Sequence, residues 1–454
     1  MQRLYPNIRT TMNTPQFLIA APHSGSGKTL VTLALLRHLK GRGLKVQPFK
    51  CGPDYLDTKL HEVAAGCSCY NLDLFMADAD GVRMRYAHQA AQADVSVVEG
   101  VMGMFDGYDR HLGSSAEVAK TLGIPVVLVV NAKAMAHTVA PLLKGFATYD
   151  PAVKIAGVIF NFVGSASHYQ LLKMAAEEVG VEPLGWIAKN DELRLESRHL
   201  GLQTEDLELI DGICTKAAQS IFTNVDIERL LEITSQPKPI LVDQPKVSSI
   251  RIRIAVAKDA AFNFIYPANI EELEQQGTIT YFSPLNDERL PDADFVYLPG
   301  GYPELYAEQL SANHAMLESI RDYCSSGGTM LAECGGMIYL GSHLTLKDGT
   351  SYPMVGIFDF GTTFRDAKCT LGYRKAMLGS VEVRGHEFHY SRSEGELPAS
   401  VAEVLSATCN PCSTGIYLKN RTLASYFHFF WGDGGHSMVE IINRISMIEG
   451  LGKR

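Results

Sequence analysis

The chain has 454 residues, more than one hydrophobic core usually supports, and two domains are therefore expected. Hydrophobic residues make up 46% and charged residues 20% of it, which is typical of a soluble globular protein. The formal net charge of −9 gives no general reason to expect nucleic acid or an anionic membrane as a partner. No apolar run approaches the ~18 residues that a membrane-spanning helix needs.

Cysteine usage and the N-terminal sequence indicate the compartment. Nine cysteines, an odd number in a long chain, are not typical of a disulfide framework. CSC at 67–69 and CNPC at 409–412 suggest zinc sites, but neither has an obvious second pair of Cys or His. The N-terminal sequence lacks the apolar core of a signal peptide. We therefore expect reduced thiols and a cytoplasmic protein.

Apolar, β-rich runs alternate with helical patterns from about residue 15 to residue 235. The runs are PQFLIAA (15–21), LKVQPFK (44–50), DVSVVEG (94–100), IPVVLVVNA (124–132), VKIAGVIFN (153–161) and PLGWIA (183–188). Strands as evenly apolar as these are buried on both faces, which predicts a parallel sheet flanked by helices. Residues 1–235 are therefore expected to form one doubly wound α/β domain.

A linker and a second domain are expected after that. Residues 236–249 contain three prolines and several polar residues, which is typical of a linker. The alternation then restarts, so we expect a second doubly wound α/β domain at 250–454. Its expected strands are IRIAVAK (252–258), TITYFSP (278–284), ADFVYLPGG (293–301), GGTMLAE (327–333), YPMVGIFDF (352–360), SVEVRGHEFHYS (380–391) and LASYFHFF (423–430).

A glycine-rich turn between the first strand and a helix predicts a phosphate-binding loop. Such a turn directs backbone N–H groups and the positive end of the helix at one point. Lys28 can reach the β- and γ-phosphates, and the Thr29 hydroxyl can bind Mg²⁺. The strict pattern has glycine where this chain has Pro22, so the loop is a variant. The residues expected to bind ATP here are Ser24, Gly25, Ser26, Gly27, Lys28 and Thr29.

Polar residues at the ends of later strands extend this site. Glu99 ends a buried strand whose carboxyl end should lie beside the loop, where its carboxylate can hold Mg²⁺. Asn161 also ends a strand and can either read the adenine edge or cap the strand. Lys50 and Asp54 follow the second strand and are assigned to the phosphates and to the metal or substrate. Lys50 can equally be a solvated strand end, and Asp54 a turn residue after Pro53.

Cys334 lies between Glu333 and two glycines, directly after an apolar run. One interpretation is a buried thiol that packs as a small hydrophobe, and the other is a nucleophile on a strand-to-helix elbow. The second needs oxyanion donors and a base. Gly300 and Gly301 end an apolar strand and offer backbone N–H groups. His428 is the best-placed base, although a lone histidine on an apolar strand is more often a core residue.

Two further histidines are rival bases. His386 and His389 flank Glu387 in GHEFHYS, an arrangement that also suits a binding role.

Several of these motifs together resemble a known family. PGGYPE, AECGG and SYFH are similar to the glutamine amidotransferase domain of cobyrinic acid a,c-diamide synthases and cobyric acid synthases, a class I, flavodoxin-like domain. The first domain resembles their dethiobiotin synthetase-type P-loop module. The motifs KCGPDYLD, YNLDLFM, VEGVMGMFDG, RHLGL, AFNFIYPANIEEL, LGYR and GHEFHYS match the a,c-diamide synthase branch in order. The resemblance covers nearly the whole chain.

The resemblance implies roles for individual residues. Cys334 would be the glutaminase nucleophile, His428 its base, and Gly301 and Gly335 the sources of the oxyanion N–H groups. Thr29, Asp54 and Glu99 would bind Mg²⁺. The implied substrate contacts are Tyr55, Asp57, His61, Asn71, Asp73 and Asp106.

The chain departs from the family pattern in two respects. The family commonly has a second histidine where Phe430 stands, and no acidic residue that would orient His428 is evident.

The implied activity is ATP- and Mg²⁺-dependent amidation of the a- and c-acetate carboxylates of cobyrinic acid with glutamine as nitrogen donor, in cobalamin biosynthesis. The implied partners are ATP, glutamine and a corrinoid, with a homodimer as an option. Three alternatives stay open: the same reaction on hydrogenobyrinic acid or nickel-sirohydrochlorin, a nucleotide-dependent switch, and a dethiobiotin-type ligase with a structural second domain. Cys334 and His428 argue against the last two.

Overall fold

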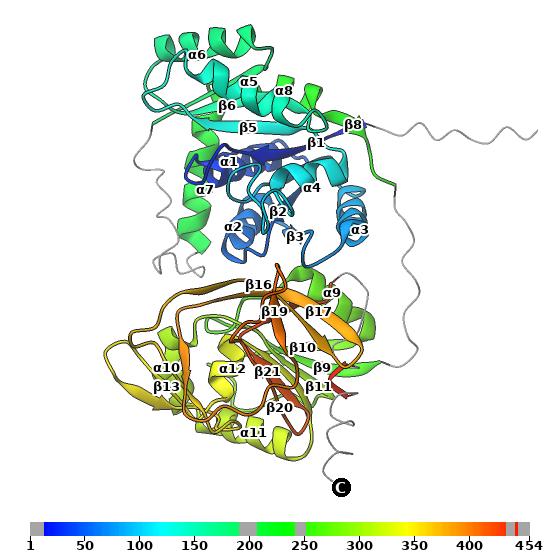
Figure 1. Cartoon of the computed structure of the whole chain (residues 1–454), viewed down its shortest axis with the longest axis vertical. Coiled ribbons are helices and arrows are strands. Elements are labelled where there is room, and N and C mark those ends of the chain that lie inside the picture. Colours follow the sequence, from blue (N-terminus) through cyan, green and yellow to red (C-terminus); the bar gives the residue numbers. More distant parts are fainter. Residues whose placement is uncertain (1–12, 190–206, 241–250, 433–440, 444–454) are drawn as a thin grey trace, which may run out of the picture. The chain divides into compact units, whose positions relative to one another are not determined.

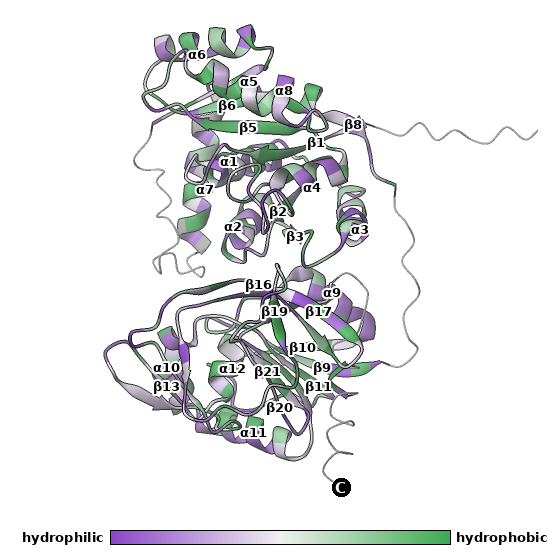
Figure 2. Cartoon of the chain, viewed as in Figure 1, coloured by the Kyte–Doolittle hydropathy of each residue, from purple (hydrophilic) through white to green (hydrophobic). Residues whose placement is uncertain are grey.

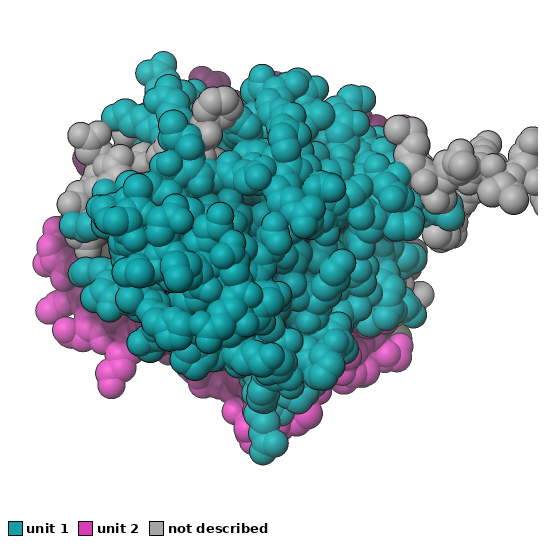
Figure 3. Space-filling view, turned by 90° about the horizontal axis from the view of Figure 1, so that it is seen from above, with its two compact units in different colours: residues 1–74, 79–243 teal, residues 75–78, 244–454 magenta. Residues whose placement is uncertain are grey.

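The computed structural model describes residues 13–189, 207–240, 251–432 and 441–443. It divides into two compact units, Met1–Leu74 with Ala79–Asp243 and Phe75–Asp78 with Gln244–Arg454, which are coloured separately in Figure 3. Within the described residues, no helix is long and apolar enough to cross a membrane. The motif RHLGL at 198–202 and most of the predicted linker lie outside the described residues.

The first unit is built on one parallel sheet with the strand order β3-β2-β4-β1-β5-β6-β7 (Figure 1). These strands are β1 (Asn13–Ala20), β2 (Val46–Cys51), β3 (Tyr70–Leu72), β4 (Val95–Glu99), β5 (Val126–Asn131), β6 (Ile155–Val163) and β7 (Pro183–Ala188). All the runs predicted as strands here form strands, and the short β3 was not predicted. Antiparallel β8 (Ser235–Pro237) pairs with the start of β1, so the first residues of the predicted linker belong to this sheet.

Helices cover both faces of this sheet, as expected for a doubly wound fold. They are α1 (Lys28–Gly41), α2 (Leu56–Ala65), α3 (Ala79–Ala90), α4 (Ser115–Leu122), α5 (Val139–Tyr149), α6 (Ala166–Glu178), α7 (Leu207–Phe222) and α8 (Ile227–Ile233). Figure 2 shows β1 and β5 as hydrophobic, whereas α6 mixes hydrophilic and hydrophobic residues. Sequence sets the helix ends: the Ser114 side chain caps α4 by accepting from Glu117 N, and Gly123 ends it with φ 68°.

The second unit has a six-stranded sheet with the order β10-β9-β11-β12-β21-β20. Its strands are β9 (Ile252–Ala257), β10 (Gly277–Phe282), β11 (Phe295–Leu298), β12 (Thr329–Glu333), β20 (Ile416–Lys419) and β21 (Thr422–Ser425). Among the described strands of this sheet, only β20, at the edge, runs antiparallel to its neighbour. The helices are α9 (Pro267–Gln276), α10 (Ala307–Ala312), α11 (His314–Ser325), α12 (Gly335–Leu340) and the 3₁₀ helix η2 (Pro303–Tyr306).

Two four-stranded sheets complete the second unit. One contains β13 (His343–Thr345), β14 (Ser351–Pro353), β15 (Gly361–Thr363) and β18 (Arg392–Glu394). The other contains β16 (Thr370–Leu378), β17 (Val381–His389), β19 (Val404–Ser406) and β22 (His428–Phe430). The long β16–β17 hairpin was only half predicted, because β16 is too polar to be distinguished from a loop.

Two strand predictions in this unit are wrong. YPMVGIFDF is not a strand beyond Pro353, and its apolar side chains instead pack into the core around α12. LASYFHFF is not one strand, because the chain leaves the central sheet after Ser425 and His428 begins β22 in another sheet. In that sheet His428 lies opposite His386. A continuous apolar run does not reveal this change of sheet.

Candidate active sites

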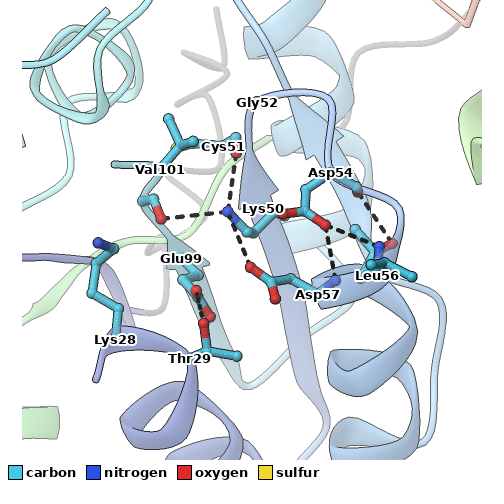
Figure 4. A network of polar contacts seen from close by, with 12 residues as sticks. Lys28, Thr29, Lys50, Cys51, Gly52, Asp54, Leu56, Asp57, Glu99 and Val101 are labelled. Atoms are coloured by element: carbon cyan, nitrogen blue, oxygen red, sulfur yellow. Dashed lines mark hydrogen bonds and ion pairs between the residues drawn. The ribbon is translucent and has the colours of Figure 1, made fainter. Parts of the chain in front are cut away.

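The predicted phosphate loop lies between β1 and α1. Gly25 and Gly27 have φ of 79° and 93°, in the left-handed region that glycine adopts without strain. A Cβ on Gly27 would lie 2.0 Å from Asn161 Nδ2, so only glycine fits there. The Lys28 ammonium donates to the Met102 carbonyl at 2.5 Å, and Figure 4 shows this side chain beside Glu99 and Thr29. The loop, the end of β4 and the segment after β4 therefore meet at one place.

Glu99 is held from two sides at the end of β4. The Thr29 hydroxyl donates to its Oε1 at 2.8 Å, and His61 Nε2 bonds its Oε2 at 2.7 Å. Cys69 Sγ lies 3.5 Å from the other ring nitrogen of His61. Burial raises the pKa of Glu99, but His61, Lys50 and Thr29 outweigh it and hold the pKa below its ordinary value. Glu99 is thus an oriented carboxylate at the phosphate loop.

Lys50 is a buried cation among acidic side chains (Figure 4). Its ammonium donates to the carbonyls of Cys51 and Gly100 at 3.3 and 3.5 Å and lies 3.6 Å from Asp57 Oδ2. Burial lowers the pKa of Lys50, but Asp57, Asp54 and Glu99 outweigh it, so the group stays charged. The structure does not place Lys50 as a solvated strand end.

Asp54 lies two residues before α2, and one of its carboxylate oxygens is already engaged. Asp54 Oδ1 accepts from the backbone N–H groups of Leu56 and Asp57, each at 2.9 Å. Burial raises the pKa of Asp57 to about 7, and the nearby Asp54 and Glu99 add to this. Asp54 therefore has the turn-forming role that the sequence left open, and its other oxygen is the one that can serve a metal.

The six residues implied as substrate contacts differ in exposure. Asp106 is exposed, and its carboxylate accepts from Gly103 N at 3.0 Å. Asn71 is buried and donates to the carbonyls of Gly52 and Asp54.

His61 has an exposure of 0% and lies behind Glu99. Its position favours support of Glu99 over contact with a large substrate. Of the remaining three, Tyr55 and Asp73 are buried and Asp57 is partly exposed.

Asn161 contacts the phosphate loop. Its side chain is 1% exposed, and its amide donates to the Ser26 carbonyl at 3.1 Å. Asn161 Oδ1 accepts from Phe162 N at 2.9 Å. The amide is thus occupied in holding the loop, and a role in reading adenine stays a prediction.

Cys334 occupies a strained turn between β12 and α12. Its φ of 46° and ψ of −101° are sparsely populated by residues other than glycine. The next glycines permit the turn, because a Cβ on Gly336 would lie 2.3 Å from the Leu298 carbonyl oxygen. Cys334 N donates to Ser425 O at 2.7 Å, which ties the turn to the end of β21. This is the geometry of a nucleophile elbow.

The thiol of Cys334 is neutral in this environment. Its exposure is 4%, and burial raises its pKa, with further increases from Glu304, Glu387 and Glu333. A thiol of this kind needs a base that removes its proton as it attacks.

Glycines surround the elbow where oxyanion donors are needed. A Cβ on Gly335 would lie 2.9 Å from Gly301 N, so the two backbones are in close contact. A Cβ on Gly300 would lie 2.3 Å from Cε1 of His428. Gly300 therefore makes room for the imidazole, a role that the sequence did not suggest.

His428 is a neutral imidazole at the same edge of the central sheet. It is 1% exposed, and burial lowers its pKa well below the ordinary value, helped by His386 and His389. Its ring stacks on that of His386, with centroids 4.9 Å apart and planes at 15°. A neutral ring at this position can accept a proton.

The two rival histidines are engaged elsewhere. His386 Nδ1 bonds the Tyr266 hydroxyl at 2.9 Å, and burial lowers its pKa to about 3. His389 Nε2 bonds Glu387 Oε1 at 2.9 Å, and Arg374 holds the other oxygen of that carboxylate at 2.6 Å. The role of His428 as the base stays a prediction.

An acidic residue near His428 was missed in the sequence. Glu333 Oε2 lies 3.9 Å from His428 Nδ1, and neither side chain is accessible to solvent beyond 1%. Burial raises the pKa of Glu333 to about 8, while bonds from Tyr297 and Phe429 N partly offset this. The signal in the sequence was a carboxylate in an otherwise apolar strand, directly before Cys334.

Comparison with known proteins identifies both domains. Residues 253–435 match the CobB/CobQ-like glutamine amidotransferase domain, and residues 17–202 match the CobQ/CobB/MinD/ParA nucleotide-binding domain. The chain is 40% identical over 432 residues to a cobyrinate a,c-diamide synthase of Listeria monocytogenes, covering 91% of this chain and 95% of that protein. The chain belongs to the cobyrinate a,c-diamide synthase family.

Two other relatives with the same name come from other organisms. The protein of Salmonella typhimurium is 41% identical, with coverage of 91% of this chain and 94% of the relative. The protein of Picrophilus torridus is 38% identical, with coverage of 92% and 96%. Like its family, the chain is an enzyme, a ligase with a glutamine amidotransferase domain and a nucleotide-binding domain.

The departure at Phe430 from the family pattern has a packing explanation. Phe430 packs edge-on against Tyr266, with centroids 5.3 Å apart and planes at 79°. Tyr266 in turn bonds His386, which stacks on His428. Phe430 thus supports the histidine pair through an apolar contact.

Proposed function

We propose that this chain catalyses the ATP- and glutamine-dependent amidation of the a- and c-acetate carboxylates of cobyrinic acid. The observation that carries the proposal is the strained elbow at Cys334, in a chain that also has a phosphate loop with an oriented Glu99. The names of relatives about 40% identical over nine-tenths of the chain supply the substrate.

The phosphate loop would activate the carboxylate. A carboxylate does not accept ammonia because oxide is a very poor leaving group, whereas an acyl phosphate loses phosphate readily. Transfer of the γ-phosphoryl group depends mainly on positioning and charge neutralisation. Lys28 at the loop and the charged Lys50 would bind the phosphate oxygens, and loop N–H groups would orient them.

The residues present suit Mg²⁺ as the cofactor. Thr29 and Glu99 place a hydroxyl and a carboxylate oxygen within 2.8 Å of each other beside the loop. Such hard oxygen donors are those that Mg²⁺ takes, usually one or two from protein with phosphate and water. Asp54 would offer a third through its unengaged oxygen. Mg²⁺ bound there would neutralise charge on the phosphates.

The second unit would release ammonia from glutamine. Cys334 Sγ attacks the side-chain amide carbon while the neutral His428 takes the thiol proton. The N–H groups of Gly301 and Gly335 would stabilise the oxyanion. His428 then returns the proton to the leaving nitrogen, the C–N bond breaks, and ammonia departs to leave a thioester on Cys334. Water hydrolyses the thioester to glutamate and restores the thiol.

Some expectations stay predictions within this proposal. Hydrogenobyrinic acid and nickel-sirohydrochlorin are alternative substrates for the same chemistry, since no residue identifies the metal in the macrocycle. A cytoplasmic location and a homodimer are likewise predicted.

Glutamine-dependent ATP hydrolysis tests the proposal. Purified chain is incubated with ATP, Mg²⁺ and glutamine, with and without each of the three tetrapyrroles, and ADP, glutamate and amidated product are quantified. We expect ADP and diamide only when cobyrinic acid is present. If only one of the other two macrocycles is amidated, that macrocycle is the substrate. If no glutaminase activity is seen with any of the three, the proposal is refuted.

A further inference from the structure

We propose that Glu333 is the residue that orients the catalytic imidazole of His428 and fixes its tautomer. This inference rests on the proposed function, in which His428 is the base for Cys334. An imidazole that accepts a proton at Nε2 must carry its own proton at Nδ1. Nδ1 of His428 is the nitrogen that lies 3.9 Å from Glu333 Oε2.

The sheet places Glu333 and Cys334 on different faces. Alternate residues of β12 face opposite sides, and Met330 and Ala332 share one apolar core with Cys334. Leu331 belongs to the other core, together with Tyr297 and Phe429, which both contact Glu333. Glu333 therefore approaches the imidazole from the face of the sheet opposite the core that contains Cys334. An orienting acid of a nucleophile–base pair occupies this position relative to its base.

Two donors hold the Glu333 carboxylate. The Tyr297 hydroxyl donates to Oε2 at 2.8 Å, and the backbone N–H of Phe429 donates to Oε1 at 3.1 Å. Phe429 directly follows His428, so the carboxylate is fixed to the backbone of the residue whose ring it faces. A carboxylate oxygen has two lone pairs, so Oε2 keeps one for Nδ1–H beside the bond from Tyr297, although their separation of 3.9 Å in this structure is longer than a hydrogen bond.

Glu387 also acts on the imidazole electrostatically, but its charge is already balanced by hydrogen-bonding partners. Glu387 accepts from Arg374 at 2.6 Å, from Thr414 at 2.5 Å and from His389 at 2.9 Å, which occupies both of its oxygens. Glu333 accepts from the neutral Tyr297 hydroxyl and Phe429 N–H, and an imidazolium that forms beside it would favour the ionised form of its carboxyl group.

Glu333→Gln tests the inference, because it keeps the shape of the side chain and removes its ability to ionise. We expect kcat for glutamine hydrolysis to fall on the order of 10²-fold, with KM for glutamine changed less than about 3-fold and amidation from free ammonia unchanged. Glu333→Asp should recover part of kcat. Glu382→Gln, on an exposed ion pair of β17, is the matched control and should behave as the wild type.

Each result separates one explanation from another. A Glu333→Gln variant with kcat within about 3-fold of wild type would overturn the inference, and so would equal losses with glutamine and ammonia, which indicate a structural role. Cys334→Ala is measured in parallel. If it keeps glutamine-dependent activity, the proposed function itself fails, whatever Glu333 does.

A measurement without substitution at Glu333 covers the case in which that variant does not fold. The ¹⁵N shifts of the His428 ring are recorded in histidine-labelled protein and assigned by their loss in His428→Asn. The inference expects Nδ1 to carry the proton of the neutral ring, and a ring protonated at Nε2 would overturn it.

Discussion

The imidazole rings of His386 and His428 stack at 4.9 Å between facing positions of β17 and β22. Each ring is buried, and a charged ring would lose solvation and repel its neighbour. The pKa of His386 is accordingly lowered to about 3 by burial, with a further decrease from Arg374. The pair is therefore an apolar stack only while both rings are neutral.

Acid should destabilise the second unit through this pair. An unfolded histidine titrates near 6.5 and the folded His386 near 3, so between these values the unfolded state binds the extra proton. Stability is thus complete above about pH 6.5 and is lost as pH falls, by ~1.4 kcal/mol per pH unit for each such histidine. Urea unfolding of a Trp186→Phe variant, followed by Trp431 fluorescence between about pH 5 and about pH 7, measures it.

His386→Gln is the comparison for that experiment. It should reduce the pH dependence of the unfolding free energy by about one proton, because one buried neutral ring is gone. An unchanged slope would show that the stack is not the source of the acid sensitivity.

Gly300→Ala should displace the imidazole of His428, the proposed base, without changing that residue. The added Cβ would lie 2.3 Å from His428 Cε1, so the ring must shift. We expect glutamine-dependent amidation to fall by about 10²-fold, since displacements near 1 Å cost that much, while ammonia is still used. Gly145→Ala, whose Cβ meets no atom within 4 Å, should leave both activities intact. Normal glutamine use by Gly300→Ala would contradict the placement of His428.

Cys334→Ser should make the enzyme dependent on ammonia. A serine hydroxyl is far less ionised than a thiol, so glutamine-dependent amidation should be lost while free ammonia, more abundant at raised pH, is still used. Cys324→Ser is the matched control, because Cys324 is a buried packing residue on α11 of the same unit. It should lower stability and spare glutamine. If both nitrogen donors fail equally in Cys334→Ser, the elbow interpretation is wrong.

Lys28→Ala should remove activity with either donor. Its ammonium lies at the phosphate loop, and in the proposed mechanism acyl phosphate formation precedes the use of any nitrogen source. A loss of at least about 10²-fold is expected with both glutamine and ammonia at saturating ATP. Lys40→Ala, exposed at the other end of α1, serves as control. Near-normal amidation by Lys28→Ala would contradict the assignment of this loop to nucleotide binding.

His61→Gln should lower the affinity for Mg²⁺, because His61 orients Glu99. His61 holds Glu99 Oε2 at 2.7 Å, while Thr29 holds the other oxygen. Loss of a residue that orients a metal ligand costs about 10- to 100-fold in metal affinity, so half-saturation by Mg²⁺ should rise accordingly. Ammonia-dependent amidation is titrated with Mg²⁺, with the exposed His137→Gln as control. An unchanged Mg²⁺ curve with reduced activity would assign His61 to the substrate instead.

Local patterns in the sequence were sufficient to predict the two α/β domains and the phosphate loop. The run of small residues before Lys28 predicts a phosphate loop because glycine spacing and the following helix are properties of one short segment. Evenly apolar strands predict parallel sheets for the same reason, and both expectations are confirmed by the fold and the family.

Which polar groups face one another was decided only by the tertiary structure. From the sequence, Asn161 could read the adenine edge or cap its strand, and the family resemblance implied that His61 contacts the substrate. In the fold, Asn161 bonds the phosphate loop and His61 bonds Glu99. No acid for His428 was evident from the sequence, although Glu333 stands beside Cys334. Their approach depends on the break after Ser425 and on the pairing of β22 with β17. Such pairing joins segments far apart in the chain, and no periodicity within either segment encodes it.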